Sequence, residues 1–147
     1  MSLDLFIAKL QGLKVKANKV VEETIKVEAP EANRKQLESG VNADGEQITK
    51  QKIRAGATTY AKGYAKLRKR KGLQTKYIDA KFTGKYHESI EAKKKSATVY
   101  EIKAKDPKAK TVEENLGNLI GLNEEAIKEV EKDIALALDE LIIKELQ

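Results

Sequence analysis

The 147-residue chain contains no cysteine, no tryptophan, one histidine and two prolines. Without cysteine there are no disulfides or thiolate metal sites, which fits a protein of a reducing compartment. One histidine cannot supply a zinc site, which needs about four ligands that are mostly Cys or His. No apolar run approaches the ~20 residues that span a bilayer, so we expect no membrane partner. Because only 5% of the residues are aromatic, the core must be aliphatic.

Charge is plentiful but unevenly placed along the chain. Charged residues make up 35% and hydrophobic residues 40% of the sequence, a composition typical of a folded protein rather than a disordered one. The net charge is +6, yet residues 47–78 hold ten Lys or Arg and no acidic residue, whereas residues 123–147 hold eight acidic residues against three Lys. The length predicts one domain, residues 1–147.

Helical periodicity is clear at both ends of the chain. Apolar residues recur every three or four positions over residues 3–27, which predicts a long helix. Pro30 predicts a kink or break, after which we expect helix over residues 31–39, ended by Gly40. Near the C-terminus, Asn123 is a typical N-cap for a final helix whose apolar stripe runs from Ile127 to Leu146.

Between the helices, alternating apolar residues predict two antiparallel strands at residues 86–92 and 97–104, joined by the polar residues 93–96. A lone hairpin is marginally stable in water, so its apolar face needs a cover. The two terminal helices have apolar stripes suited to this, and we expect one shared core. The predicted fold class is therefore α+β, a small antiparallel sheet packed against long N- and C-terminal helices.

The basic segment at about residues 48–76 has faint periodicity and several glycines. We interpret it as a mobile loop with a short helix over residues 60–71, and concentrated like charge suggests that it meets a partner instead of supporting the core. The candidate partner-binding residues are Lys62, Lys66, Arg68, Lys69, Arg70 and Lys71. One partner class is an acidic protein surface; the alternative is nucleic acid, bound between Lys50 and Lys76 with help from the interleaved tyrosines.

Catalytic chemistry is hard to assemble from this sequence. His87 and Ser89 have strand spacing, but a hydrolase also needs a carboxylate to orient the histidine and a donor for the oxyanion. We interpret His87 as a solvent-facing strand residue and keep a hydrolase as a third, weakest hypothesis. We predict no enzyme activity, no catalytic residues, no cofactor and no metal site.

Several short stretches, taken in order, resemble a known family. The stretch QLESGVNADG at residues 36–45, the tyrosines Tyr60 and Tyr64, FTGKYHESI at residues 82–90, ENLG at residues 114–117 and IGL at residues 120–122 carry the likeness. Together they resemble the neck and tail-completion (head–tail joining) proteins of tailed bacteriophages and prophages. Each stretch is weak alone, and their order carries the resemblance.

The resemblance implies a structural virion protein of α+β fold and no catalysis. Such a protein acts in head–tail joining or tail completion, forms a ring oligomer in the assembled particle, and docks onto other virion proteins. It would be found in the virion, and in the host bacterial cytoplasm during assembly. Self-association and virion proteins are therefore the expected partners, with nucleic acid as the alternative.

Overall fold

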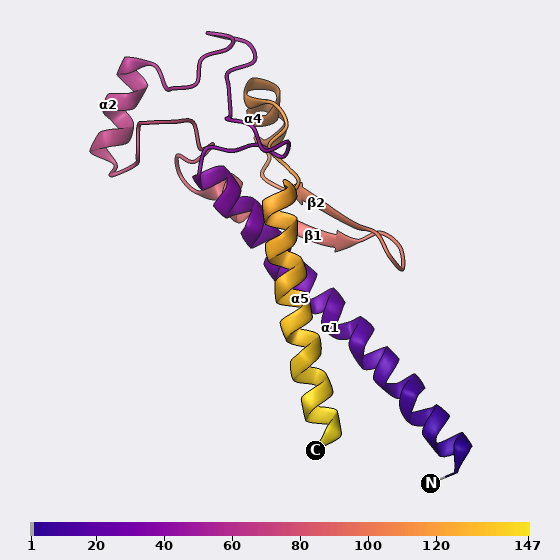
Figure 1. Cartoon of the computed structure of the whole chain (residues 1–147). Coiled ribbons are helices and arrows are strands. Elements are labelled where there is room, and N and C mark those ends of the chain that lie inside the picture. Colours follow the sequence, from indigo (N-terminus) through magenta and orange to yellow (C-terminus); the bar gives the residue numbers. More distant parts are fainter. Residues whose placement is uncertain (1) are drawn as a thin grey trace.

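The computed structural model describes residues 2–147 and has an α+β fold. Helices α1 (Leu3–Glu38) and α5 (Glu124–Leu146) pack together and form a stalk, with both termini at its free end (Figure 1). Residues 39–123 form a head at the other end. The head contains α2 (Lys62–Arg70), α3 (Lys85–Glu88), β1 (Ile90–Lys94), β2 (Tyr100–Ala104) and α4 (Ala109–Leu116). The predicted small antiparallel sheet and long terminal helices are confirmed.

Helix α1 is continuous through Pro30, so the predicted kink or break is wrong. A proline inside a helix costs about 3 kcal/mol or more. Here the surrounding turns are held by tertiary packing, since Ala29, Ala32 and Leu37 are buried along with Pro30 itself. Packing therefore outweighs the local preference of proline to end a helix.

Three ends of the stalk helices are capped, and the caps at Gly40 and Asn123 are the predicted ones. The Ser2 hydroxyl accepts a hydrogen bond from the Leu5 amide, and the Asn123 side chain accepts one from the Ala126 amide. At the end of α1, Gly40 has φ of 77°, its amide donates to the Leu37 carbonyl, and the next amide donates to the Gln36 carbonyl. These two bonds form a Schellman motif, which satisfies carbonyls that the helix leaves free.

The hairpin is shorter than predicted, and residues 86–89 are not part of it. Strands β1 and β2 pair with Ile90 opposite Ala104 and Ala92 opposite Ile102. The preceding Gly84 has φ of 86°, and the next four residues make the single turn of α3. Tyr86 and Ile90 are four residues apart, so one helical turn followed by a strand buries both of them. Alternation of apolar residues alone did not distinguish this arrangement from a longer strand.

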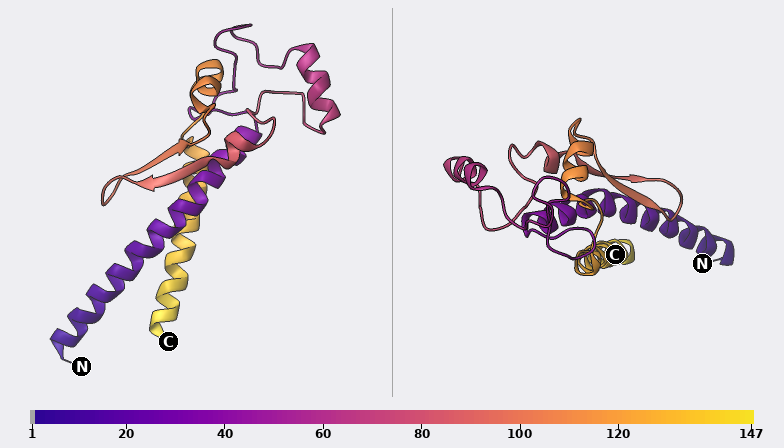
Figure 2. Two further views of the ribbon diagram at one scale, coloured as in Figure 1. Left: turned by 180° about the vertical axis from the view of Figure 1, so that it is seen from behind. Right: turned by 90° about the horizontal axis from the view of Figure 1, so that it is seen from above.

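The apolar interior consists of two clusters rather than the single predicted core. The larger lies in the head beneath β1, and the smaller joins α1 to α5 through Ala32, Ala126 and Val130, with Ile134 packed on its edge. The viewpoint from above in Figure 2 shows α1 between the hairpin and α5, so the hairpin face and α5 each pack on α1. The members of the larger cluster are Leu37, Ile48, Tyr60, Ile78, Tyr86, Ile90, Ala109, Leu116 and Leu119.

Two buried amide side chains of α1 hold the loop that leads into α5. Asn33 donates to the Leu119 carbonyl and accepts from the Gly121 amide, each at 3.0 Å. Gln36 donates to the Gly121 carbonyl at 3.0 Å and accepts from the Asn123 amide at 2.9 Å. Each amide is satisfied on both its donor and acceptor sides, so these bonds fix where α5 begins against α1.

Candidate assembly surface

Arg68 is the only fully buried member of the predicted partner-binding set. Its side chain is 0% exposed, and its Nη2 atom lies 3.0 Å from each carboxylate oxygen of Asp79. Its Nε atom donates to the Gln74 carbonyl at 3.0 Å, Nη1 donates to the Lys81 carbonyl, and the guanidinium lies 4.1 Å from the Tyr60 ring centroid. The prediction that Arg68 meets a partner is therefore wrong, because every face of this guanidinium is occupied within the chain.

Asp79 is the acceptor around which the neighbouring polar groups are arranged. The Tyr60 hydroxyl donates to Oδ1 at 2.9 Å, the Lys81 amide donates to Oδ1 at 3.0 Å, and Gln74 Nε2 donates to Oδ2 at 2.8 Å. The Asp79 amide in turn donates to the Tyr60 hydroxyl at 3.1 Å. Burial raises the pKa of the Tyr60 phenol, which keeps it protonated and able to donate. A buried ion pair is tolerated when hydrogen bonds satisfy its remaining atoms, as they do here.

The basic segment is consequently connected to the core at several points. Ile48, Tyr60 and Arg68 are all buried, and α2 confirms most of the short helix predicted within the segment. A loop with no part in the core is thus the wrong description of residues 48–76. The four-residue spacing of Tyr64 and Arg68 was an available signal, because it places an aromatic ring and this arginine on one face of α2. A second signal was Asp79, the first acidic residue after Glu46.

His87 lies in α3 and is buried, contrary to the predicted solvent-facing strand position. Its Nε2 atom lies 2.8 Å from the Asp79 carbonyl oxygen, an acceptor, so Nε2 carries the proton. Within residues 2–147, Nδ1 has no hydrogen-bond partner, and burial lowers the pKa of the ring. Ser89 donates instead to the Tyr86 carbonyl at 2.7 Å, so the two side chains do not form a nucleophile–base pair in this structure.

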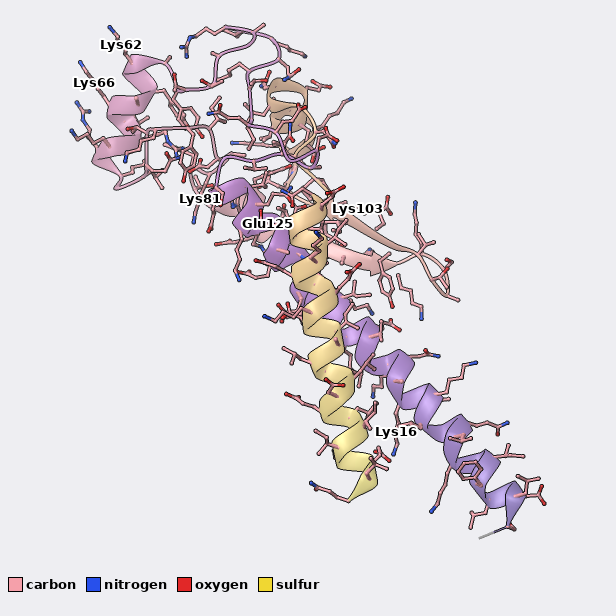
Figure 3. All side chains as sticks on the ribbon, viewed as in Figure 1. Lys16, Lys62, Lys66, Lys81, Lys103 and Glu125 are labelled. Atoms are coloured by element: carbon pink, nitrogen blue, oxygen red, sulfur yellow. The ribbon has the colours of Figure 1, made fainter. Side chains whose placement is uncertain are left out.

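The other five predicted residues form an exposed basic surface. Lys62, Lys66, Lys69, Arg70 and Lys71 are all exposed, and none makes an ion pair within residues 2–147. Lys62 and Lys66 point away from the rest of the molecule in Figure 3. The ammonium of Lys71 lies 4.7 Å from the Phe82 ring centroid, which draws it back toward the head. We call the exposed side of α2, with Lys62, Lys66, Leu67 and Arg70, its outer face.

The stalk exposes apolar side chains that a folded monomer normally buries. Lys16 pairs with Glu145 at 2.8 Å, next to the end of α5, so the residues of α1 before Lys16 extend beyond α5 (Figure 3). This projecting end is roughly 20 Å long at 1.5 Å per residue. On it, Leu3 is 71%, Phe6 50% and Leu10 51% exposed. The stalk also exposes Leu136, Ile142, Ile143 and Leu146 on α5. No helix within residues 2–147 is long and apolar enough to cross a membrane.

Midway along the stalk, an open groove of about 390 Å³ lies between α1 and α5. Its apolar lining includes Val20 and Val27 from α1 and Leu136 from α5, of which Val27 is 64% and Leu136 53% exposed. Both helices contribute carboxylates to the lining, and no Lys or Arg is among the lining residues. We call it the acidic groove; its lining residues are Val20, Glu23, Thr24, Val27, Glu28, Asp133, Leu136, Ala137 and Glu140. Among residues 2–147, Glu28, Asp133 and Glu140 make no ion pair.

Comparison of the chain with protein families, with curated proteins and with solved structures finds no match. Within residues 2–147, no group of three or more His, Cys, Asp or Glu side chains could hold a metal ion. Three surfaces of the molecule are suited to contact a partner: the outer face of α2, the acidic groove and the apolar side chains of the stalk.

Proposed function

We propose that this chain is a structural virion protein of a bacteriophage or prophage, acting in head–tail joining or tail completion by ring oligomerisation and docking onto neighbouring virion proteins. The short stretches between residues 36 and 122 that resemble this family, and occur in the family's order, support the choice of family. The stalk gives a physical reason for assembly. The proposal includes no catalytic step, and in this structure His87 Nε2 and Ser89 Oγ each bond a backbone carbonyl instead of one another.

The projecting end of α1 is the observation that carries the proposal. An isolated helix of about a dozen residues is marginal in water, and most helical stability comes from packing an apolar face. Phe6 and Leu10 lie on such a face, yet α5 ends before it reaches them. Partner proteins that bury this face would stabilise the helix, as expected of a subunit that is complete only within an assembly.

Sedimentation velocity across a concentration series, followed by negative-stain imaging, tests the assembly. We expect discrete ring-shaped oligomers at high concentration. The variant Phe6→Ser/Leu10→Ser should assemble more weakly by about tenfold or more, because burying each large apolar side chain stabilises an interface by about 1.5–3 kcal/mol. The matched control is Ile53→Ser/Val99→Ser, which changes two other exposed apolar residues, 82% and 50% exposed, away from the stalk.

A wild-type protein that remains monomeric throughout would contradict the proposal. Equal loss of assembly in both double variants would show that general surface apolarity, and not the stalk, drives association.

Nucleic-acid binding through α2 is the second candidate, favoured by the exposed cations of its outer face. A protein that contacts phosphates releases counterions, so the logarithm of its affinity falls linearly with the logarithm of salt concentration. Titration of labelled duplex DNA at several salt concentrations distinguishes the candidates. Three results together would favour nucleic acid over assembly. The wild type would bind DNA tightly with a steep dependence on salt, Lys66→Glu/Arg70→Glu would lose this binding, and the wild type would form no oligomers.

A further inference from the structure

No Lys or Arg lines the acidic groove. Glu23 and Glu28 line it from α1 and Asp133 and Glu140 from α5, together with exposed apolar side chains of both helices. Within residues 2–147, the one ion pair that any of these four carboxylates makes is the 3.9 Å contact of Glu23 with Lys19, four residues earlier on α1. Like charges placed around a concave surface repel one another and favour a cationic occupant. A suitable occupant carries several cations and at least one apolar side chain.

The outer face of α2 has this chemistry. Lys62, Lys66 and Arg70 follow one another at four-residue spacing and so lie along one side of the helix, with Leu67, 40% exposed, beside them. Arg68 points into the core on the opposite side and fixes which side faces outward. No acidic residue occurs in residues 47–78 to neutralise these cations locally.

The α2 helix cannot reach the groove of its own chain. Figures 1 and 2 show α2 at the head end of the molecule, away from the stalk. The bonds of Arg68 to Asp79, Gln74 and Lys81 hold α2 in that position. Contact between the two surfaces therefore requires two molecules.

We propose that the outer face of α2 in one copy docks into the acidic groove of a second copy of this chain. This inference rests on the self-assembly in the proposed function and names the contact that would make it. Both complementary surfaces are present on one chain, which is why we choose a second copy over an unrelated partner. Because the contact joins two different surfaces, each copy offers one helix and one groove, and repetition closes into a ring when the rotation permits.

Two charge-reversal variants test the contact in the full-length protein. Lys66→Glu/Arg70→Glu reverses the outer face, and Glu23→Lys/Glu140→Lys reverses one carboxylate on each wall of the groove. All four side chains are exposed, so both variants should fold normally by circular dichroism. Each should weaken self-association, measured by sedimentation velocity, by about tenfold or more. Lys108→Glu/Lys110→Glu is the matched control, since it reverses two exposed cations in and beside α4.

Mixing the two variants is the decisive measurement. The reversed α2 of one variant is complementary to the reversed groove of the other, and the unchanged α2 and groove are also complementary. An equimolar mixture should therefore recover self-association while each variant alone does not. General effects of net charge on solubility would not depend on which two variants are mixed in this way.

Three outcomes would overturn the inference. If the wild type assembles and both variants assemble equally well, the contact is wrong while the proposed function stands. If only the groove variant loses assembly, the groove takes another segment, such as the projecting end of α1, and α2 is not its occupant. If the wild type never associates, the contact and the proposed ring assembly fail together.

Discussion

Arg68 and Asp79 determine how the basic part of the chain joins the core. The two side chains are 0% and 6% exposed, and their charges are paired directly. Breaking a buried ion pair by removing one partner typically costs about 3–5 kcal/mol, because the remaining charge is left without compensation. This pair therefore stabilises the fold, whereas the neighbouring lysines of α2 are exposed on the surface.

Arg68→Ala should lower the free energy of unfolding by about 3–5 kcal/mol, because Asp79 would be buried without a counterion. Lys69→Ala, one residue away and exposed, should change it by less than about 0.5 kcal/mol. Urea denaturation followed by circular dichroism measures both. Similar midpoints for the two variants would show that the guanidinium is not a structural group, and would restore Arg68 to the candidate binding surface.

His87 gives the fold a dependence on pH. Burial lowers its pKa in the folded protein, so the unfolded chain binds a proton more readily than the folded one. Above the unfolded pKa of about 6.5 the ring is neutral in both states and burying it requires no loss of a proton. Below that value the free energy of unfolding decreases, because the unfolded chain gains a proton that the folded protein does not bind. Asp79, Glu38 and Lys81 are the charged residues that modify the effect from nearby.

We expect the free energy of unfolding to decrease between pH 7.5 and pH 5.5, with a slope below about 1.4 kcal/mol per pH unit, the limit for one proton. His87→Gln should flatten this slope, and its own stability should be lower than wild type at pH 7.5 because the bond to the Asp79 carbonyl is disturbed. Urea titrations at several pH values provide the test. An identical slope in the variant would assign the pH dependence to another group.

At the scale of elements, sequence periodicity predicted the helices at both ends of the chain and the existence of a hairpin, and residue type predicted the caps at Gly40 and Asn123. Both failed where tertiary contacts outweigh local preference. Pro30 is accommodated because the turns around it are buried. Residues 85–88 form a helical turn that begins directly after Gly84, which has a left-handed conformation. Arg68 was assigned to the surface because charge composition describes a segment, whereas burial depends on which side of a helix faces a distant carboxylate.

Substitution by alanine should have opposite effects on stability at Gly12, inside α1, and at Gly40, just after its C-terminal end. Gly40→Ala places a Cβ 2.6 Å from Tyr77 Cδ2 at φ of 77°, so it should destabilise the fold by about 1–2 kcal/mol from the backbone conformation alone, and by more from the clash. Gly12→Ala, inside α1 with nothing within 4 Å, should instead stabilise the helix by roughly 0.5–1 kcal/mol. Thermal unfolding of both variants is the measurement, and effects of the same sign would contradict this description of α1.

At the scale of the whole molecule, charge is divided between two regions that serve different purposes. The head presents exposed cations on α2, and the stalk presents carboxylates between α1 and α5. The buried pair of Arg68 and Asp79 is shielded from solvent ions, whereas the proposed contact between copies forms from exposed groups. Salt concentration should therefore affect assembly strongly and folding only weakly.

Raising NaCl from 0.1 M to 1 M shortens the Debye length from about 10 Å to about 3 Å, which weakens attraction between exposed charges. We expect the dissociation constant for self-association to rise by about tenfold or more, while the midpoint of thermal unfolding of the monomer changes little. In Lys66→Glu/Arg70→Glu the salt response should reverse sign, because salt then screens repulsion between the reversed α2 face and the acidic groove. The residual association of this variant would depend on apolar side chains of the stalk. Phe6→Ser/Leu10→Ser should associate more weakly than wild type at every concentration of salt but keep the wild-type salt response, because its outer α2 face and acidic groove are unchanged. Self-association that strengthens with salt in the wild type would identify apolar burial, and not charge, as the force that joins the copies.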